Sequence, residues 1–245
     1  MNELLWVSSI PLAYLLYRGT KVTYNDVIAY YKNEESDNLS DEKFGEKVKI
    51  IGVGGGGSAI VEYLSNKYPN RYDSIILNSD KKALTSRDVT NKIHLEKSDD
   101  FGCGSNTLCG YNLINDSVID KLKSFINTDK KVFIFATLGG GCGTGSVKAL
   151  SQYLSMKDLD IQYLLTTPFS WEGLKRTNRA NETIEFLKNN NAKITVFSND
   201  ELLKFGNMSI KDCFNKQDEE FHKIIGLLFL EKSWKSVLSS NLVII

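Results

Sequence analysis

Two glycine-rich stretches are the parts of this sequence best suited to chemistry. The first reads IIGVGGGGSAIVEYL over residues 50–64, and the second reads FATLGGGCGTGSVKAL over residues 135–150. Each lies between a strand-like apolar run and a helical pattern. Glycine lets backbone N–H groups approach a phosphate closely, and the start of the following helix carries partial positive charge. The two stretches therefore predict a phosphate-binding site built largely from backbone.

The first stretch also fits a different ligand. Gly52, Gly54 and Gly57 match the G-x-G-x-x-G fingerprint of dinucleotide sites. Asp80 follows roughly 20 residues later, where a ribose-binding acid is expected. An NAD-type site is therefore one interpretation, and a tight turn without a ligand is another.

The second stretch favours a triphosphate, because two glycine turns can hold different phosphates of one ligand. No lysine follows the glycines in the manner of GxxxxGK[ST], so the site is not the usual P-loop. Charge compensation must then come from backbone N–H groups, helix ends and a cation.

The composition is that of an ordinary globular chain. Of 245 residues, 42% are hydrophobic and 24% are charged, which is typical of soluble domains. Lys and Arg total 30, as do Asp and Glu, so net charge predicts no binding to nucleic acid or to an anionic membrane. Four cysteines form no dense disulfide framework in a chain this long, and we predict a reducing, cytoplasmic location. The spacing of Cys103 and Cys109 is not typical of zinc, so no metal site is predicted.

Strand-like and helical patterns alternate after residue 47. Strands are predicted at 48–53, 74–78, 92–95, 132–137, 161–167 and 193–198, and helices at 58–67, 113–126, 146–155 and 172–188. A last long helix is predicted over 210–238. Apolar strands that alternate with helices indicate an α/β fold, here a Rossmann-like parallel sheet with helices on both faces and a long central helix at the end.

The first 47 residues are predicted to form an N-terminal extension with an acidic linker at 33–47, before a nucleotide-binding domain at 48–245. The apolar run at 4–17 is shorter than the roughly 20 residues that a membrane span requires. It is interpreted as a short buried helix, with peripheral membrane contact as the alternative.

Several stretches resemble motifs of tubulin and the bacterial protein FtsZ. GGGCGTGS in the second glycine cluster resembles the signature GGGTGTG or GGGTGSG, with Cys142 at the first threonine. IIGVGGGGSA in the first cluster is similar to the first glycine loop of FtsZ. LNSDKKAL, at 77–84, is similar to its INTDxxAL.

The resemblance continues further along the chain. FGCGSNTLCG at 101–110 resembles LGAGANPExG, and PFSWEGLKRTNRA at 168–180 resembles PFxFEGxxRxxxA. FSNDELL at 197–203 resembles IPNDxLL. Because the matches keep their order from Lys47 to about Phe221, the sequence is identified as a member of the tubulin/FtsZ superfamily.

The resemblance implies a site for GTP or GDP with Mg²⁺. Residues of the two glycine clusters would contact the phosphates and the sugar: Gly54, Gly55, Gly56, Gly57, Ser58, Gly139, Gly140, Gly141, Cys142, Gly143 and Thr144. A third loop with Gly102, Gly104 and Asn106 would sense the terminal phosphate. Asp80 would lie near the phosphates and act through a metal-bound water.

The resemblance also assigns residues to the ribose and the base. Glu172 and Arg176 would hold the ribose and a phosphate, although their spacing of four residues also fits an ordinary helical ion pair. FtsZ recognises the guanine base through the side chains of an asparagine and an aspartate. Ala59 stands at the first position and has no hydrogen-bonding side chain, and Glu219 stands at the second. Glu219 and the neighbouring Asp218 also fit a solvated helix face.

The end of the sequence departs from the family. In FtsZ an N-x-D-x-x-D loop after the central helix completes the GTPase site of the neighbouring subunit. Here Asn241 stands at the asparagine, Val243 replaces the first aspartate, and the sequence stops before the second. We therefore assign no catalytic residue.

Three functions remain open on this evidence. The first is a GTP-binding protein of bacterial cytoskeletal or cell-division type, with weak or no hydrolysis of its own. The second is a GTPase completed in trans by a full-length FtsZ-like or tubulin-like subunit in a mixed filament. The third is a degenerate domain that binds a partner and no nucleotide.

Overall fold

The computed structural model describes residues 47–97, 101–126, 131–155 and 159–241, with side chains as far as residue 226. The predicted extension before Lys47, and Val243, lie outside the described residues. Among those that are described, no helix is both long and apolar enough to cross a membrane.

The predicted strands form one parallel sheet. They are β1 (Val48–Val53), β2 (Tyr72–Asn78), β3 (Asn91–His94), β4 (Lys131–Thr137), β5 (Asp160–Thr167) and β6 (Lys193–Ser198). Their order in the sheet is β3-β2-β1-β4-β5-β6, which is the Rossmann-like order. In the register, Ile51 pairs with Ile75 of β2 on one side and with Ile134 of β4 on the other.

Helices connect the strands. They are α3 (Gly54–Lys67), α4 (Lys81–Thr85), α5 (Thr107–Asn112), α6 (Asp116–Ile126), α7 (Cys142–Tyr153), α8 (Leu174–Asn189) and α9 (Ile210–Asn241). Two short 3-10 helices, η4 (Ser170–Glu172) and η5 (Asn199–Phe205), lie after β5 and β6.

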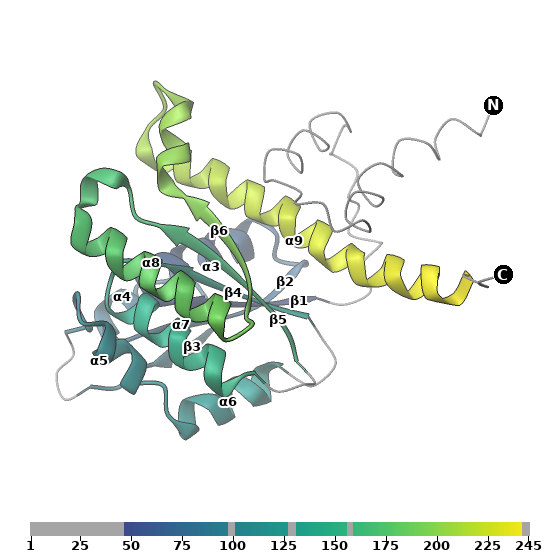
Figure 1. Cartoon of the computed structure of the whole chain (residues 1–245), viewed down its shortest axis with the longest axis horizontal. Coiled ribbons are helices and arrows are strands. Elements are labelled where there is room, and N and C mark those ends of the chain that lie inside the picture. The colour runs from purple at the N-terminus through teal and green to yellow at the C-terminus, as the bar shows by residue number, and fades with distance from the viewer. Residues whose placement is uncertain (1–46, 98–100, 127–130, 156–158, 242–245) are drawn as a thin grey trace. The chain divides into compact units, whose positions relative to one another are not determined.

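Each face of the sheet has its own core, because side chains alternate along a strand. Ile51 and Val53 of β1 belong to the core that α6, α7 and α8 complete, whereas Val48 and Ile50 belong to the core that α3 and α9 complete. Figure 1 shows α7 and α8 in front of the sheet and α3 behind it. The predicted α/β fold with helices on both faces is confirmed.

Two predicted helices differ from the observed ones in ways that affect the site. The helix predicted at 58–67 begins four residues earlier, so the first glycine cluster forms its first turn rather than a separate loop. The helix predicted at 113–126 begins only at Asp116, after α5 has ended at Asn112. Asn115 sets this start, because its side-chain oxygen accepts the N–H of Val118.

Candidate functional site

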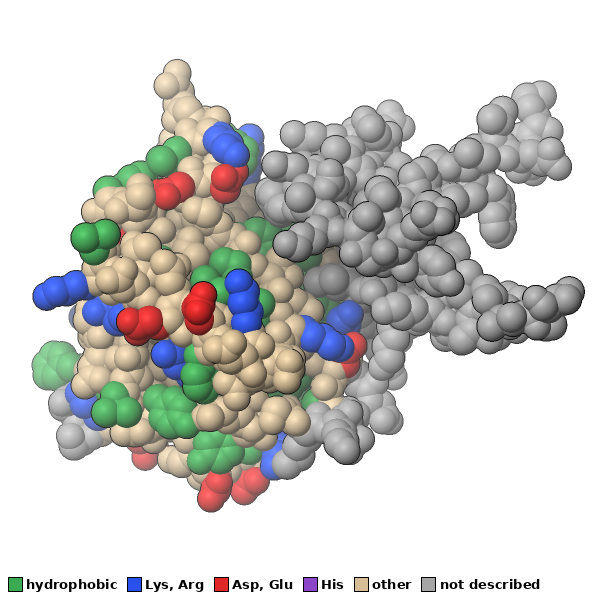
Figure 2. Space-filling model, viewed as in Figure 1, with side chains coloured by type: hydrophobic (Ala, Val, Ile, Leu, Met, Phe, Trp, Pro, Cys, Tyr) green, Lys and Arg blue, Asp and Glu red, His purple; other side chains and the backbone are tan. Residues whose placement is uncertain are grey.

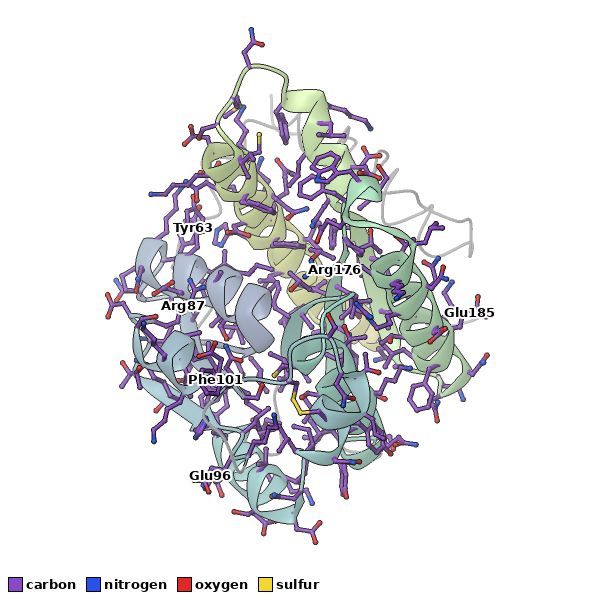
Figure 3. The ribbon with its side chains drawn as sticks, turned by 90° about the vertical axis from the view of Figure 1, so that its left-hand side faces the viewer. Tyr63, Arg87, Glu96, Phe101, Arg176 and Glu185 are labelled. Carbon is purple, nitrogen blue, oxygen red and sulfur yellow. A yellow bond between two sulfur atoms is a disulfide. The ribbon has the colours of Figure 1, made fainter. Side chains whose placement is uncertain are left out.

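The two glycine clusters follow β1 and β4, which are neighbours in the sheet. The strand order reverses between them, and open α/β sheets bind ligands outside the carboxyl ends of their strands at such a reversal. Figure 3 views the domain from this end. The fold thus brings together two stretches that are about 85 residues apart in the sequence, and it does so at the position where a ligand is expected.

The two clusters touch through their backbones. Gly54, the first residue of α3, has a φ of +73°, and a Cβ placed on it would lie 2.8 Å from the backbone nitrogen of Gly143. Only glycine adopts this conformation freely and permits this approach. The first turns of α3 and α7 are therefore packed against each other.

The second cluster is held in shape from inside. Gly139 has a φ of +99°, and its N–H donates to the Oγ1 of Thr144 at 2.9 Å. Thr144 is fully buried, and its hydroxyl closes the loop. The N–H of Leu138 donates to the carbonyl of Thr166 at 2.8 Å, which fixes the loop to β5.

Helices α3 and α7 begin without a side-chain cap and without an acidic residue in their first turns. The first N–H groups of a helix have no partner within it, and they carry partial positive charge. By contrast, α4 is capped by Asp80, which accepts from Ala83, and α5 is capped by Asn106, which accepts from Cys109. The starts of α3 and α7 are therefore open to an external anion; α8 also begins without a side-chain cap, at Gly173.

Space beside these helix starts is open. A Cβ placed on Gly55 or on Gly140 would meet no described atom within 4 Å. Ser58, at the end of the first cluster, has a buried hydroxyl without a hydrogen-bond partner among the described residues. Gly56 and Gly57, in contrast, pack closely against Thr137 and Phe135.

The third predicted loop contacts both neighbours. The N–H of Gly141 donates to the carbonyl of Gly104 at 2.7 Å. A Cβ on Gly102 would lie 3.2 Å from the Cβ of Asp80. The structure therefore places Asp80 and the loop of Gly102, Gly104 and Asn106 at the same end of the sheet as the glycine clusters.

Cys103 and Cys109 form a disulfide across this loop. Sequence reasoning weighed the two cysteines only as metal ligands and did not predict the bond. The described residues contain no group of three or more His, Cys, Asp or Glu side chains able to hold a metal ion. The other two cysteines, Cys142 and Cys213, are free and buried.

Glu172 and Arg176 form an ion pair next to the second cluster. Glu172 also accepts the N–H of Phe169 at 2.9 Å and thereby caps η4. A Cβ on Gly139 would lie 3.2 Å from the Cβ of Arg176, so the pair borders the glycine loop. The ordinary ion pair considered in the sequence analysis is thus present, and it lies at the site.

One charged residue at the second cluster was missed. The Nε–H of Arg179, on α8, donates to the carbonyl of Gly139 at 2.9 Å. Its sequence signal is the spacing of three residues from Arg176, which places both arginines on one face of a helix.

Glu219 is not brought to the glycine clusters. One of its carboxylate oxygens forms an ion pair with Lys67 and accepts from the hydroxyl of Tyr63 at 3.1 Å. The hydrogen bond from Lys67 holds the pKa of Glu219 below its ordinary value. Lys67 is the last residue of α3, about 20 Å along the helix from Gly54 at a rise of 1.5 Å per residue.

Asp218, beside Glu219, is 6% exposed. Burial, and next the charge of Glu219, raise the pKa of Asp218 to about 7. The alternative of a solvated helix face therefore does not hold for Asp218, which is buried. Figure 2 shows the face of the domain that Figure 1 also views; basic and acidic side chains are interspersed on it.

The sequence matches one family of known proteins. The family model described as the GTPase domain of the Tubulin/FtsZ family matches residues 47–207. The cell division protein FtsZ of Aquifex aeolicus is 31% identical over 183 residues, which cover 73% of this chain and 50% of that protein. FtsZ of Mycoplasmopsis pulmonis is 32% identical over 169 residues, which cover 68% of this chain and 43% of that protein.

Solved structures agree with the sequence relatives. An FtsZ dimer from M. jannaschii superposes with a TM-score of 0.63 and 26% identity over 81% of this chain and 56% of that one. CetZ2 from Haloferax volcanii, solved as a GTPγS-bound protofilament, gives a TM-score of 0.66 at 21% identity over 76% of this chain and 59% of that one. The chain spans about half the length of the curated relatives that it matches.

Proposed function

The chain belongs to the tubulin/FtsZ family through its GTPase domain, and on that premise we propose that it binds GTP or GDP at the two glycine clusters. The observation that carries the proposal is the contact between two uncapped helix starts, α3 at Gly54 and α7 at Gly143. Two converging helix N-termini suit an anion with several charges. A triphosphate or diphosphate has that charge, and it needs both clusters.

Side chains around the clusters would complete the phosphate site. Arg176 and Arg179 border the second cluster from α8, and a guanidinium is well suited to bind phosphate oxygens. Asp80 would hold Mg²⁺ through a water molecule, because Mg²⁺ prefers oxygen ligands and keeps several waters. With no larger acidic group among the described residues, the phosphates would supply the remaining ligands.

The base would lie along α3 toward α9. Guanine offers its N1–H and amino group to a carboxylate acceptor, but Glu219, the acceptor that the resemblance assigns, pairs with Lys67 at the far end of α3. Glu219 must share its carboxylate with Lys67 and Tyr63, and Ala59 contributes no side-chain hydrogen bond. We therefore propose only a modest preference for guanine over adenine nucleotides.

Hydrolysis by the chain alone is proposed to be slow. Two carboxylates border the glycine clusters, and each already has a role: Asp80 caps α4 and is assigned here to Mg²⁺, and Glu172 is held by Phe169 and Arg176. Neither is therefore assigned to the attacking water. A partner subunit would have to supply the acid, and a full-length FtsZ-like protein is the partner whose family suits this role.

Calorimetry with GTP, GDP, ATP and NAD, each with Mg²⁺, tests the binding proposal. We expect GTP and GDP to bind more tightly than ATP and NAD. The margin over ATP should stay below tenfold, because one lost hydrogen bond costs about 1 kcal/mol. Tightest binding of NAD would favour the dinucleotide site instead. No binding of any nucleotide would favour a domain that binds a partner alone.

Phosphate release tests the hydrolysis proposal. The protein alone should turn over slowly, since positioned acid–base groups typically contribute about 10²–10⁴-fold to rate. Adding a full-length FtsZ-like protein from the same cell should raise turnover above that of the partner alone. Brisk hydrolysis by the pure chain would overturn the need for a partner.

A further inference from the structure

The loop between Cys103 and Cys109 is tied at both ends. The N–H of Cys103 donates to the buried hydroxyl of Ser79 at 3.0 Å, which fixes the loop to the end of β2. Cys109 lies in α5, and its N–H donates to the side chain of Asn106. The disulfide joins these two anchors, with Gly104 and Ser105 exposed between them. Figure 3 shows the bond in yellow at the same end of the domain as Arg176.

The loop and the second glycine cluster are in direct backbone contact. Besides the bond from Gly141 to Gly104, a Cβ on Gly141 would lie 2.6 Å from the Gly104 oxygen and 2.8 Å from the Asn106 oxygen. On the other side of the disulfide, a Cβ on Gly110 would lie 2.5 Å from the Gly141 oxygen. A shift of the loop therefore displaces Gly141 at the start of α7.

The position of the disulfide allows it to be reduced and formed again by exchange with a small thiol. Cys103 is buried, but Cys109 is partly exposed, so a small thiol can approach the bond. In exchange with a small dithiol, the S–S bond breaks. Two electrons and two hydrogens pass to the cysteine sulfurs, and the dithiol closes to its own disulfide. The reverse exchange restores the bond.

We propose that Cys103 and Cys109 form a redox switch that sets the affinity of the site for the terminal phosphate of a nucleoside triphosphate. When the disulfide is formed, the loop is held against Gly141. The loop is then already ordered before the ligand binds. With the bond reduced, the ligand must order a freer loop, and binding is weaker. This inference rests on the proposed function, because it requires a triphosphate at the glycine clusters.

The effect depends on the number of phosphates. The resemblance to FtsZ places this loop at the terminal phosphate, so GTP should respond to the redox state and GDP much less. GDP therefore serves as an internal control. By linkage, GTP must favour the disulfide by the factor by which the disulfide favours GTP.

The test compares the full chain with the disulfide formed, confirmed by thiol titration, and the same chain after reduction with dithiothreitol. We expect GTP affinity measured by calorimetry to fall about fivefold or more on reduction, with GDP affinity nearly unchanged. At a fixed ratio of reduced to oxidised dithiothreitol, added GTP should raise the oxidised fraction of the pair.

Two variants assign the effect to this pair of cysteines. The double variant Cys103→Ser/Cys109→Ser should bind GTP as the reduced protein does and should not respond to dithiothreitol, although it keeps Cys142. The control Cys213→Ser, in α9 away from the loop, should keep the full redox response.

Several results would overturn the switch. One is equal GTP affinity in both redox states, with binding intact, and this would leave the proposed function standing. A redox response that persists in the double variant would transfer the effect to Cys142 or Cys213 and overturn the switch as well. Absence of nucleotide binding in every state would overturn the proposed function together with it.

Discussion

Arg179 and Gly139 are joined by a hydrogen bond from the guanidinium Nε–H to the glycine carbonyl, at 2.9 Å. The bond ties α8 to the loop that precedes α7. Gly139 adopts a left-handed conformation with φ of +99°, and this bond adds to the one from its own N–H to Thr144 in fixing the loop. A half-buried arginine thus positions backbone groups that belong to another part of the sequence.

Arg179→Ala should therefore weaken nucleotide binding. Loss of a hydrogen bond from a charged donor costs roughly 1.5–3 kcal/mol, which corresponds to at least about tenfold in affinity. Calorimetry with GDP measures the change. Lys175→Ala, an exposed cation on the same helix, is the matched control and should bind normally. Equal affinities in the two variants would contradict a positioning role for Arg179.

Alanine substitutions at the adjacent glycines Gly54 and Gly55 should have different effects on stability. Gly54→Ala places a side chain at φ of +73° and 2.8 Å from Gly143, so it should lower the free energy of unfolding by at least about 1–2 kcal/mol. Gly55→Ala points into open space and should keep the stability. It should nevertheless weaken nucleotide binding, because the methyl group fills the space proposed for phosphate. Thermal melting and calorimetry separate the two effects, and a destabilised Gly55→Ala would contradict the geometry.

Arg176→Ala should affect binding more than stability. Its ion pair with Glu172 is exposed on the arginine side, and such pairs contribute about 0–1 kcal/mol to stability. A lost contact to phosphate would cost roughly 1.5–3 kcal/mol of binding free energy. Lys204→Ala, which removes another exposed helical ion pair, is the control. If Arg176→Ala binds GTP normally, Glu172 and Arg176 form only a surface pair.

Asp218 should make stability depend on pH. Burial raises its pKa from 3.8 to about 7 in the folded chain, so between these values the folded state binds the proton more tightly than the unfolded state. Stability should therefore fall as the pH rises from about 4 to about 7. Asp218→Asn should remove this fall and gain on the order of 2–4 kcal/mol at pH 8, at 1.36 kcal/mol per pKa unit.

Denaturant unfolding of Asp218→Asn at pH 5 and pH 8 measures this difference. At pH 5 the gain of the variant should be smaller than at pH 8, because pH 5 lies only about one unit above the unfolded pKa of 3.8. Glu185→Gln, which alters an exposed carboxylate on α8, is the control and should leave the pH profile unchanged. A variant with no gain at pH 8 would show that the Asp218 carboxyl is solvated.

Local properties of the sequence were enough to predict the fold class. Strands buried on both faces need continuous apolar runs, so VKIIGV and VFIFAT could be recognised without knowing their neighbours. The glycine clusters could be recognised as turns between a strand and a helix, because the required backbone freedom is a property of glycine itself. The motifs that resemble FtsZ lie within these same local elements.

Contacts between distant segments were decided only by the tertiary structure. β1 and β4 are separated in the sequence by two further strands, and only their pairing in the sheet brings Gly54 against Gly143. Side-chain partners are equally non-local. Asp80 and Asn106 turned out to cap helices, Glu219 to pair with Lys67, and Cys103 to bond with Cys109. A polar side chain binds whichever group packing places within about 3 Å, and a one-dimensional pattern does not contain that distance.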